Sequence, residues 1–384
     1  MPSPRSIHVK NFGPIVEAHV ELGDVTVIVG PQAAGKSLFL QLLKLLIDRP
    51  CIVNELRRNN LFWDAKKPEE FFRIYFGEGL GGVWTKSTEV SLNEQNVSAM
   101  TLSSPKCKPR DPYVFYLPAQ RVMALRDGLT HPFSDFRAGD PYVVRSFSDN
   151  IHRLVQTEFA SRSLLFPSEG RMNQAIRRAL AQALFGSFEL LLDRTEAQRR
   201  FVLKGDGANL PFMNWSAGQR EFTPLLLGLL WLMPAGGAQR RDEIQHVVIE
   251  EPEMGLHPKA ISAFLLVVLE LLRRGYRVCI STHSPHVLDV IWALRVFQEY
   301  SAEPRDVRRI FSIKSGPFID EVARTALGKS YKTYYFPSGD KAVDISDLDP
   351  GHESEEVRGW GGLTAFTANI GDVIAEVVSR SGRR

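Results

Sequence analysis

Eight consecutive residues, GPQAAGKS from Gly30 to Ser37, match the pattern G-x-x-x-x-G-K-[ST] at every fixed position. In such a loop, successive backbone N–H groups and the positive end of the following helix converge on a β-phosphate. We expect Lys36 to reach the β and γ phosphates of a nucleotide and the Ser37 hydroxyl to ligate Mg²⁺. The predicted nucleotide-binding residues are Gly30, Pro31, Gln32, Ala33, Ala34, Gly35, Lys36, Ser37 and Leu38.

A pair of carboxylates follows an apolar run in the segment HVVIEEPEMGLHP. The run from Val247 to Glu250 is typical of a buried strand in a parallel sheet, whose carboxyl end faces the ligand crevice. We therefore expect Glu250 to hold Mg²⁺, usually through water, and Glu251 to polarise the attacking water. Aspartate is the more usual residue at such a metal position, so the division of roles between the two glutamates stays open. The alternative is an ordinary solvated strand end.

The segment RVCISTHSPHVLDV repeats this design, with His283 at the end of another apolar strand. A histidine there is placed to hydrogen-bond the γ-phosphate and so to report its presence. The alternative is a structural histidine with its hydrogen bonds satisfied. The predicted catalytic residues are Glu251, His283 and Lys36.

A second candidate anion site lies in NWSAGQRE, some 30 residues before the acidic strand, where a helix is expected to open. Ser216 suits the N-cap of that helix, Gly218 lets a phosphate approach the backbone, and the helix N-terminus favours an anion. Within one chain these residues cannot easily reach the nucleotide on the first loop, because a long segment intervenes. The predicted site comprises Ser216, Ala217, Gly218 and Gln219, acting in trans.

Four segments, taken in order, resemble the ATP-binding-cassette ATPase superfamily. They are the phosphate loop, the segment Ser216–Gln219 (called the signature below), the acidic pair and the histidine. In that superfamily two heads sandwich two ATP molecules, and each signature caps the γ-phosphate bound by the opposite head. The segments IHVKNFGPI, IEEPEMGLHP and STHSPHVL are similar to the branch containing RecF, the chromosome-maintenance (SMC) ATPases and the OLD-type ATPases. The resemblance rests on residues 5–50 and 200–290, and implies ATP and Mg²⁺ as cofactors and a homodimer or higher homo-oligomer.

Four further residues are weaker candidates within this resemblance. The segment LPAQR is similar to the one that supplies a glutamine or arginine to the active site, which makes Gln120 a candidate metal ligand and Arg121 a candidate site residue. The alternative is a strand followed by a proline turn. Lys10 and Asn11, in IHVKNFGPI, are the other two candidates.

The elements that must position these residues follow from periodicity and breakers. We expect the helix after the phosphate loop to run to about Ile47, where Pro50 ends it, and a helix to span Lys259 to Arg273. Helical periodicity is expected over 141–197 and a final helix over 368–380. The expected strands are SIHVKNF, AHVEL, Val25 to Val29, FFRIYF, GGVWT, YVFYLP ending at Pro118, a hairpin over 201–212, HVVIEEPE, RVCISTHS, RIFSI and FIDEV.

The predicted fold class is α/β: an ABC-ATPase head with a mixed sheet flanked by helices, an antiparallel β part and an inserted helical lobe. One head is expected to span residues 1–384, with a nucleotide-binding core over 1–125 and 200–340. The inserted lobe is expected over about 135–200 and a C-terminal segment over 341–384.

Composition is ordinary for a folded, soluble chain, with 44% apolar and 24% charged residues and 23 Phe. The net charge of +3 neither demands nor excludes nucleic acid. The three cysteines form no CxxC pair, which argues against a zinc site or disulfide framework. No apolar run reaches the roughly 18–20 residues of a membrane span, so we expect a cytoplasmic protein without a membrane partner.

Two related protein classes fit less well. About 180 residues separate the phosphate loop from the signature without sustained heptads, so long coiled-coil arms are not expected. OLD-like nucleases carry a metal-binding domain after the ATPase, and here only Asp347 and Asp349 form a D-x-D, for which a polar turn with Pro350 and Gly351 is the alternative. Seven arginines are candidates for a nucleic-acid or partner surface, or for a solvated helix face: Arg153, Arg162, Arg171, Arg177, Arg178, Arg199 and Arg200.

The resemblance implies an ATPase that dimerises head to head on ATP and gates a DNA-linked or effector-linked response. Compact heads of this sort resemble the ATPase subunits of bacterial antiphage defence systems, which act with a separately encoded effector protein. DNA is the other candidate partner. The alternative functions are a RecF-like ATPase of DNA repair, a transporter ATP-binding subunit and an OLD-like nuclease.

Overall fold

A mainly parallel sheet lies at the centre of the computed structural model, which describes residues 4–193, 199–205, 207–235, 239–241 and 243–381. Neighbouring strands pair in parallel, except that β16 runs antiparallel to β15. All five residues of β3 and of β13 are buried, as expected for strands covered on both faces. In spatial order the strands are β16 (Val343–Asp344), β15 (Tyr331–Tyr335), β3 (Val25–Val29), β14 (Arg277–Ser281), β13 (His246–Glu250) and β6 (Val114–Leu117).

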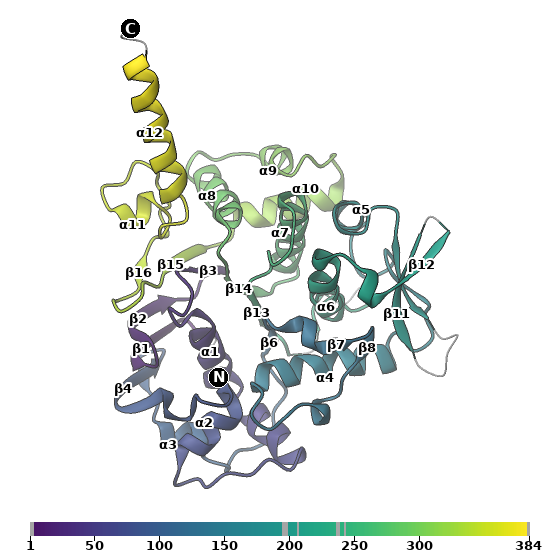
Figure 1. The fold of residues 1–384 in the computed structure, drawn as a ribbon, viewed down its shortest axis with the longest axis vertical. Coiled ribbons are helices and arrows are strands. Elements are labelled where there is room, and N and C mark those ends of the chain that lie inside the picture. The colour runs from purple at the N-terminus through teal and green to yellow at the C-terminus, as the bar shows by residue number, and fades with distance from the viewer. Residues whose placement is uncertain (1–3, 194–198, 206, 236–238, 242, 382–384) are drawn as a thin grey trace.

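Antiparallel sheets flank this centre on opposite sides of the molecule (Figure 1). The N-terminal sheet has the order β2 (Ile15–Glu21), β1 (Ser6–Phe12), β4 (Trp84–Leu92), β5 (Gln95–Asn96). The second sheet has the order β12 (Ala208–Pro211), β11 (Arg200–Gly205), β10 (Glu189–Asp193), β9 (Leu164–Phe166). A short ribbon joins β7 (Leu125–Arg126) to β8 (Leu129–Thr130). The pairing of β11 with β12 confirms the predicted hairpin, although Asp206 in its turn lies outside the described residues.

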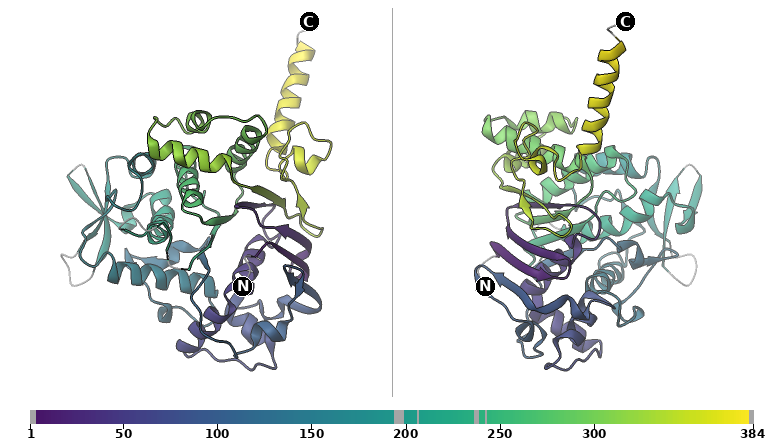
Figure 2. Two further views of the ribbon diagram at one scale, coloured as in Figure 1. Left: turned by 180° about the vertical axis from the view of Figure 1, so that it is seen from behind. Right: turned by 60° about the vertical axis from the view of Figure 1, so that its left-hand side comes forward.

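The helices occupy the connections between these strands. The α-helices are α1 (Lys36–Arg58), α2 (Pro68–Phe76), α3 (Ala99–Ser103), α4 (Tyr142–Thr157), α5 (Gln174–Leu184), α6 (Ala217–Leu232), α7 (Pro258–Arg273), α8 (Pro285–Glu299), α9 (Pro304–Ile310), α10 (Pro317–Leu327), α11 (Glu355–Arg358) and α12 (Ala365–Ser381). The 3₁₀ turns are η1 (Gly81–Val83), η2 (Arg121–Ala124), η3 (Phe133–Asp135) and η4 (Phe212–Asn214). In Figures 1 and 2, α12 extends away from the rest of the molecule.

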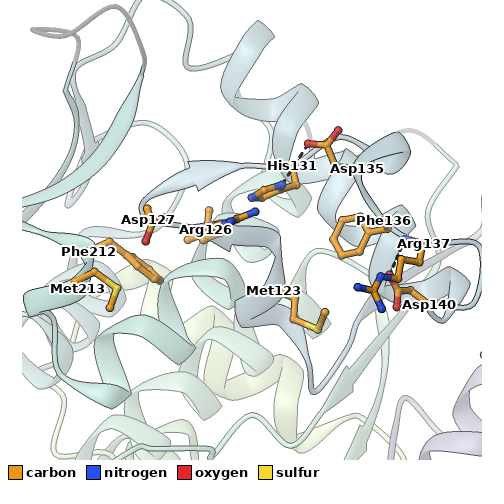
Figure 3. Close-up of a pocket in the computed structure, with 11 residues that line it drawn as sticks. Met123, Arg126, Asp127, His131, Asp135, Phe136, Arg137, Asp140, Phe212 and Met213 are labelled. Carbon is orange, nitrogen blue, oxygen red and sulfur yellow. Dashed lines mark hydrogen bonds and ion pairs between the residues drawn. The ribbon is translucent and has the colours of Figure 1, made fainter.

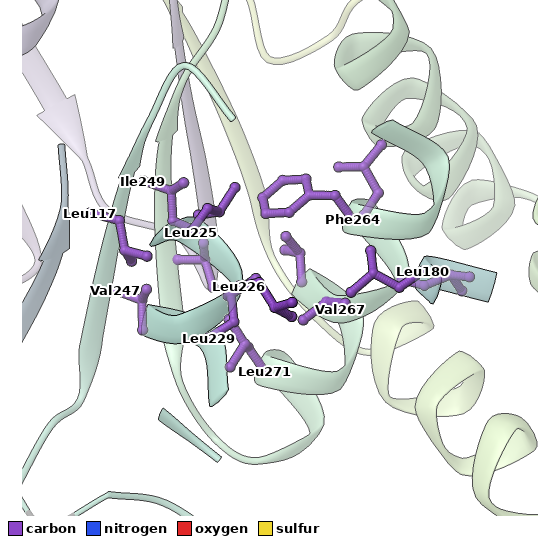
Figure 4. Packing of buried hydrophobic residues seen from close by; sticks show 14 of the residues in the cluster. Leu117, Leu180, Leu225, Leu226, Leu229, Val247, Ile249, Phe264, Val267 and Leu271 are labelled. Atoms are coloured by element: carbon purple, nitrogen blue, oxygen red, sulfur yellow. The ribbon is translucent and has the colours of Figure 1, made fainter. Parts of the chain in front are cut away.

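Hydrophobic cores lie on the two faces of the central sheet. Alternation along β3 sends Val27 into one core with α6 and α7, and Ile28 into the other core with α1 and the N-terminal sheet. Figure 4 shows the first core, where side chains of β13, α6 and α7, among them Val247, Leu225 and Val267, gather in one cluster. The sheet is therefore fixed from both sides, and its strand ends are held in register.

The helix after the phosphate loop does not end at Pro50, and the prediction that it stops near Ile47 is wrong. The helix α1 kinks at Asp48, where φ is −109° and ψ is 17°, and continues to Arg58. The Asp48 carboxylate accepts from the N–H groups of Tyr113 and Val114 at 2.8 and 2.9 Å. These contacts tie the kinked turn to β6, so the missing N–H of the proline bends the helix instead of ending it.

Three predicted strands are helices. The segment FFRIYF forms the second half of α2, RIFSI overlaps the end of α9, and FIDEV lies within α10. Each helix has proline at its first position, Pro68, Pro304 and Pro317. The fixed φ of proline suits that position, and the short apolar runs that follow were too brief to distinguish a strand from a helix. The predicted GGVWT strand begins only at Trp84, and the helical region 141–197 also contains β9 and β10.

Two of the seven candidate surface arginines are buried. Arg171 donates from Nη1 to the carbonyl of Leu230 at 3.1 Å and pairs with Glu158 at 2.6 Å, while Arg177 donates to the carbonyl of Ser168. Both arginines are structural contacts of the lobe, so the expectation of a surface role is wrong for them. Any basic surface would have to come from the remaining arginines.

The D-x-D segment forms a turn. Asp347 pairs with Arg295 at 3.2 Å, and the Asp349 carboxylate accepts from the Gly351 N–H at 2.8 Å. Within the described ranges, no group of three His, Cys, Asp or Glu side chains could hold a metal ion. No helix in the same part of the chain is long and apolar enough to span a membrane.

Candidate functional site

Four of the predicted segments leave the central sheet at the same edge. The strands β3, β14, β13 and β6 are consecutive neighbours, and all four run in parallel. In register, Glu250 lies opposite Ser281, and Ser281 lies opposite Ile28. The phosphate loop, the histidine, the acidic pair and the segment with Gln120 therefore follow neighbouring strand ends, where open α/β sheets bind ligands.

Glycines are required at both ends of the phosphate loop. A Cβ on Gly30, whose φ is +148°, would lie 2.2 Å from the carbonyl oxygen of Phe336. A Cβ on Gly35, whose φ is +91°, would lie 2.6 Å from the side chain of Ile15, the first residue of β2. Among the described residues, the N–H groups of residues 32–35 donate no backbone hydrogen bond of normal geometry. They are available to an anion, which is what a phosphate cradle requires.

Lys36 is buried and turns back onto its own loop. Its Nζ donates to the carbonyls of Gly30 and Pro31 at 2.8 and 2.9 Å, and lies 3.1 Å from Nε2 of His283. Burial lowers the pKa of Lys36, and the carboxylates of the acidic segment oppose that shift. The loop carbonyls thus hold the ammonium at the place where we expect phosphate oxygens to bind.

Glu250 is 1% exposed and is held by the segment that follows β6. Its Oε2 accepts from the Ala119 N–H at 2.9 Å, whereas Oε1 is buried without a hydrogen-bond partner in the described part of the chain. Burial raises the pKa of Glu250, while the Ala119 N–H and the Ser37 hydroxyl act to lower it. An orphaned carboxylate oxygen beside a serine hydroxyl is an oxygen-donor set that fits Mg²⁺.

Glu251, His283 and Lys36 form a chain of contacts. Glu251 Oε1 lies 3.3 Å from His283 Nε2, the same nitrogen that Lys36 approaches. Burial and the nearby Glu253 raise the pKa of Glu251 to about 8, and burial lowers the pKa of His283. The backbone φ of Glu251 is +42°, an unfavourable conformation for a glutamate that sites under functional constraint tend to retain.

Glu253 belongs to this cluster, and the sequence interpretation missed it. Its Oε1 accepts from the Thr282 hydroxyl at 2.7 Å and from the backbone N–H of His283 at 2.6 Å. The signal in the sequence was a third acid in the run EEPE, two positions after Glu251. Glu253 therefore connects the acidic segment to the histidine that follows β14.

The signature residues cap α6 away from the phosphate loop. Ser216 and Gln219 form a reciprocal capping box, with Gln219 N–H donating to Ser216 Oγ at 3.3 Å and Ser216 N–H donating to Gln219 Oε1 at 3.0 Å. Ser216 and Ala217 are exposed. Within the described ranges, no hydrogen bond or ion pair joins residues 216–219 to the phosphate loop of the same chain. Their exposure leaves them accessible to another molecule.

The weaker candidates lie in different surroundings. Gln120 is exposed, directly before η2, with no side-chain hydrogen bond within the described residues. Lys10 pairs across the N-terminal sheet with Glu17 and Glu89 in the strand register, and Asn11 donates to the carbonyl of Ser87. Within the described part of the chain, none of these three residues forms a hydrogen bond or ion pair with the acidic cluster. Arg121, in contrast, is fully buried beside that cluster.

A separate groove of about 750 Å³ lies between the segment 123–140 and the η4 turn. Figure 3 shows Met123 and Phe136 on one side and Phe212 and Met213 on the other. None of the predicted nucleotide, metal or signature residues lines it. It is therefore distinct from the group of Lys36, Glu250, Glu251, Glu253 and His283 at the ends of the parallel strands, called the strand-end cluster below.

Solved structures of low identity align with much of the chain. An SMC head bound to the C-terminal winged-helix domain of ScpA has 10% identity and a TM-score of 0.42, over 89% of this chain and 97% of that one. An SMC head domain from Thermotoga maritima has 15% identity and a TM-score of 0.33, over 74% and 91%. A dimeric bacterial ABC transporter cassette has 13% identity and a TM-score of 0.35, over 88% and 98%. The search of curated proteins finds no relative.

A protein family matches residues 25–289, which is more than half of the chain. The matched region contains the phosphate loop, the signature, the acidic segment and His283. The family match confirms the predicted membership in the AAA ATPases, and the central sheet flanked by helices confirms the predicted α/β fold class. The chain belongs to the family described as AAA domain, putative AbiEii toxin, type IV TA system.

Proposed function

We propose that this chain is a Mg²⁺-dependent ATPase, converting ATP and water to ADP and phosphate, whose copies close head to head on ATP. The observation that carries the proposal is the division of the predicted residues into two places. Glu251, His283 and Lys36 are in contact beside the phosphate loop, while Ser216 and Ala217 are exposed at the start of α6. Two copies facing each other would complete each nucleotide site with the signature of the partner.

The residues of the strand-end cluster have separable roles in this proposal. The loop N–H groups and Lys36 bind the phosphates, with Lys36 exchanging the carbonyls of Gly30 and Pro31 for phosphate oxygens. Ser37 and Glu250 would hold Mg²⁺, which neutralises developing charge on the phosphate oxygens when it is bound. His283 contacts the γ-phosphate from the neighbouring strand end.

Glu251 orients and deprotonates the attacking water. With a pKa of about 8, its carboxyl carries a proton near pH 7 in the free protein. It must release that proton before it can accept one from water, and the nearby Lys36 ammonium acts to lower the pKa of this carboxyl.

We further propose that the closed dimer, or a higher homo-oligomer, gates a separately encoded effector protein in antiphage defence, within the cytoplasm. The family description, which names a putative toxin of a type IV TA system, is what suggests the defence role. DNA is the competing partner and would indicate a RecF-like role in repair.

The test is the Glu251→Gln variant, which keeps the side chain's size but removes the base. With ATP and Mg²⁺, light scattering is expected to show a stable dimer, whereas Lys36→Ala, which cannot bind the phosphates, stays monomeric under the same conditions. A monomeric Glu251→Gln protein alongside a monomeric wild type would overturn the head-to-head model. Affinity purification of the trapped dimer then identifies the partner as an effector protein, DNA or RNA.

A further inference from the structure

Arg121 joins three elements through its guanidinium group. Its Nη1 donates to the carbonyl of Glu250 at 2.9 Å and to that of Pro118 at 3.4 Å, and Nη2 donates to the carbonyl of Glu251 at 3.0 Å. Its Nε donates to the carbonyl of Glu221 at 3.1 Å. The acceptors belong to the end of β6, the end of β13 and the first turns of α6.

Every one of these acceptors is a backbone carbonyl, and the arginine is 0% exposed. A buried guanidinium costs several kcal/mol unless its donors are satisfied, so the three elements are held in the relative positions that satisfy it. The planar fork of arginine reaches three directions at once, which a lysine ammonium on a flexible stem does not reproduce. A small shift of α6 would therefore move the guanidinium group and change its hydrogen bonds to the carbonyls of Glu250 and Glu251.

A second contact links the same two elements. A Cβ on Gly218 would lie 2.6 Å from the carbonyl oxygen of Gly255, so the first turn of α6 packs backbone against backbone on the loop after the acidic pair. Gly255 itself has a φ of +69°, which favours glycine. The signature and the acidic segment of one chain are thus in direct contact at one point and bridged by Arg121 at another.

We propose that Arg121 is a positioning residue that couples the signature helix α6 to the acidic end of β13 within one chain. The proposal rests on the head-to-head function above: a nucleotide bound by the second copy contacts Ser216–Gln219 and displaces the first turn of α6. Arg121 transmits that displacement to the backbone of Glu250 and Glu251. Each head therefore hydrolyses its own ATP efficiently only when its signature is occupied by the nucleotide of the partner.

The experiment compares Arg121→Lys and Arg121→Met in the full chain with Arg126→Lys and Arg126→Met. Arg126 is an exposed arginine on β7, outside the strand-end cluster, and serves as the matched control. Hydrogen bonds to a charged group contribute about 1.5–3 kcal/mol, so kcat of both Arg121 variants should fall about 10–100-fold. KM should change less than about threefold, because the phosphate loop is untouched. The Hill coefficient for ATP should fall toward 1 in the Arg121 variants only.

Two further measurements separate coupling from folding and from the proposed function. Combining Arg121→Lys with Gly218→Ala should lower kcat by less than the product of the single effects, because both changes act on one link. Adding Arg121→Lys to Glu251→Gln should leave the ATP-trapped dimer intact in light scattering.

If Glu251→Gln alone does not dimerise, the proposed function fails. If it dimerises while Arg121→Lys keeps the kcat and Hill coefficient of the wild type, the coupling role fails. Loss of folding in both Arg121 variants would assign the residue to the core alone and also overturn the proposal.

Discussion

Gly30 is the residue whose lack of a side chain can be tested most directly. Gly30→Ala would place a methyl group 2.2 Å from the Phe336 carbonyl oxygen, in a backbone conformation that L side chains rarely adopt. We expect it to lower the free energy of unfolding by about 1–3 kcal/mol and to weaken ATP binding. Urea unfolding and nucleotide titration measure the two effects. Gly82→Ala, where nothing lies within 4 Å of the added methyl, is the control, and equal losses in both variants would contradict the explanation.

His246 at the start of β13 gives a pH-dependent prediction. Burial and the nearby Arg277 lower the pKa of His246 from 6.5 to about 4. Between these values the unfolded chain binds a proton that the folded chain does not, so stability is complete above about pH 6.5 and is lost as the pH falls toward 4. Thermal midpoints recorded across this window should fall less steeply for His246→Leu than for the wild type. Parallel curves for the two proteins would show that another group causes the slope.

At the scale of elements, the kink in α1 depends on the Asp48 carboxylate. Asp48 is 0% exposed and accepts from Lys44 as well as from the N–H groups of Tyr113 and Val114. Asp48→Ala leaves the Lys44 ammonium without its carboxylate and should lower the free energy of unfolding by about 3–5 kcal/mol. Asp48→Asn, which keeps an acceptor, should cost less.

Urea unfolding of Asp48→Ala should be read against Asp111→Ala, which removes an exposed acid from the segment just before β6. Near-wild-type stability of Asp48→Ala, or an equal loss in both variants, would mean that the proline bends the helix without help from the buried pair.

The sequence predicted the local part of the site and not its connections. The loop from Gly30 to Ser37 and the acidic strand could be recognised because each carries its signal within a dozen residues. Three of the four hydrogen bonds of Arg121 reach residues a hundred or more positions away, and no sequence pattern near Arg121 indicates acceptors at Glu221 and Glu250. Helices such as α9 and α10 were interpreted as strands because short apolar runs carry little periodicity, although the prolines at their starts were a usable signal.

At the scale of the molecule, one of the two strands that pair with β3, the strand before the phosphate loop, lies outside the family-matched region. The match ends at residue 289, yet β15 pairs with β3 from Tyr331↔Val25 to Tyr335↔Val29. The Phe336 N–H then donates to the Val29 carbonyl at 2.8 Å, directly before the loop. Residues well beyond the matched region thus form one wall of the candidate nucleotide site.

This arrangement predicts different outcomes for two shortened chains. A protein ending at residue 330 lacks β15 and should lose ATP binding and cooperative unfolding, because β3 would become an edge strand with unpaired backbone groups. A protein ending at residue 364 lacks only α12, whose described side chains are exposed, and should keep both properties. Nucleotide titration and circular dichroism distinguish them. Equal ATP affinity in the two shortened proteins would show that β15 is dispensable.

The same pairing has a consequence for the order of events during synthesis. The phosphate loop is made among the first residues of the chain, but the backbone that closes against Gly30 arrives roughly 300 residues later. At about 5–20 residues per second, this interval lasts on the order of 15–60 s. During that time β3, whose five residues are all buried in the folded protein, lacks first both neighbouring strands and then β15 alone. We therefore expect a nascent chain of this protein to bind ATP only after the C-terminal strand has been made.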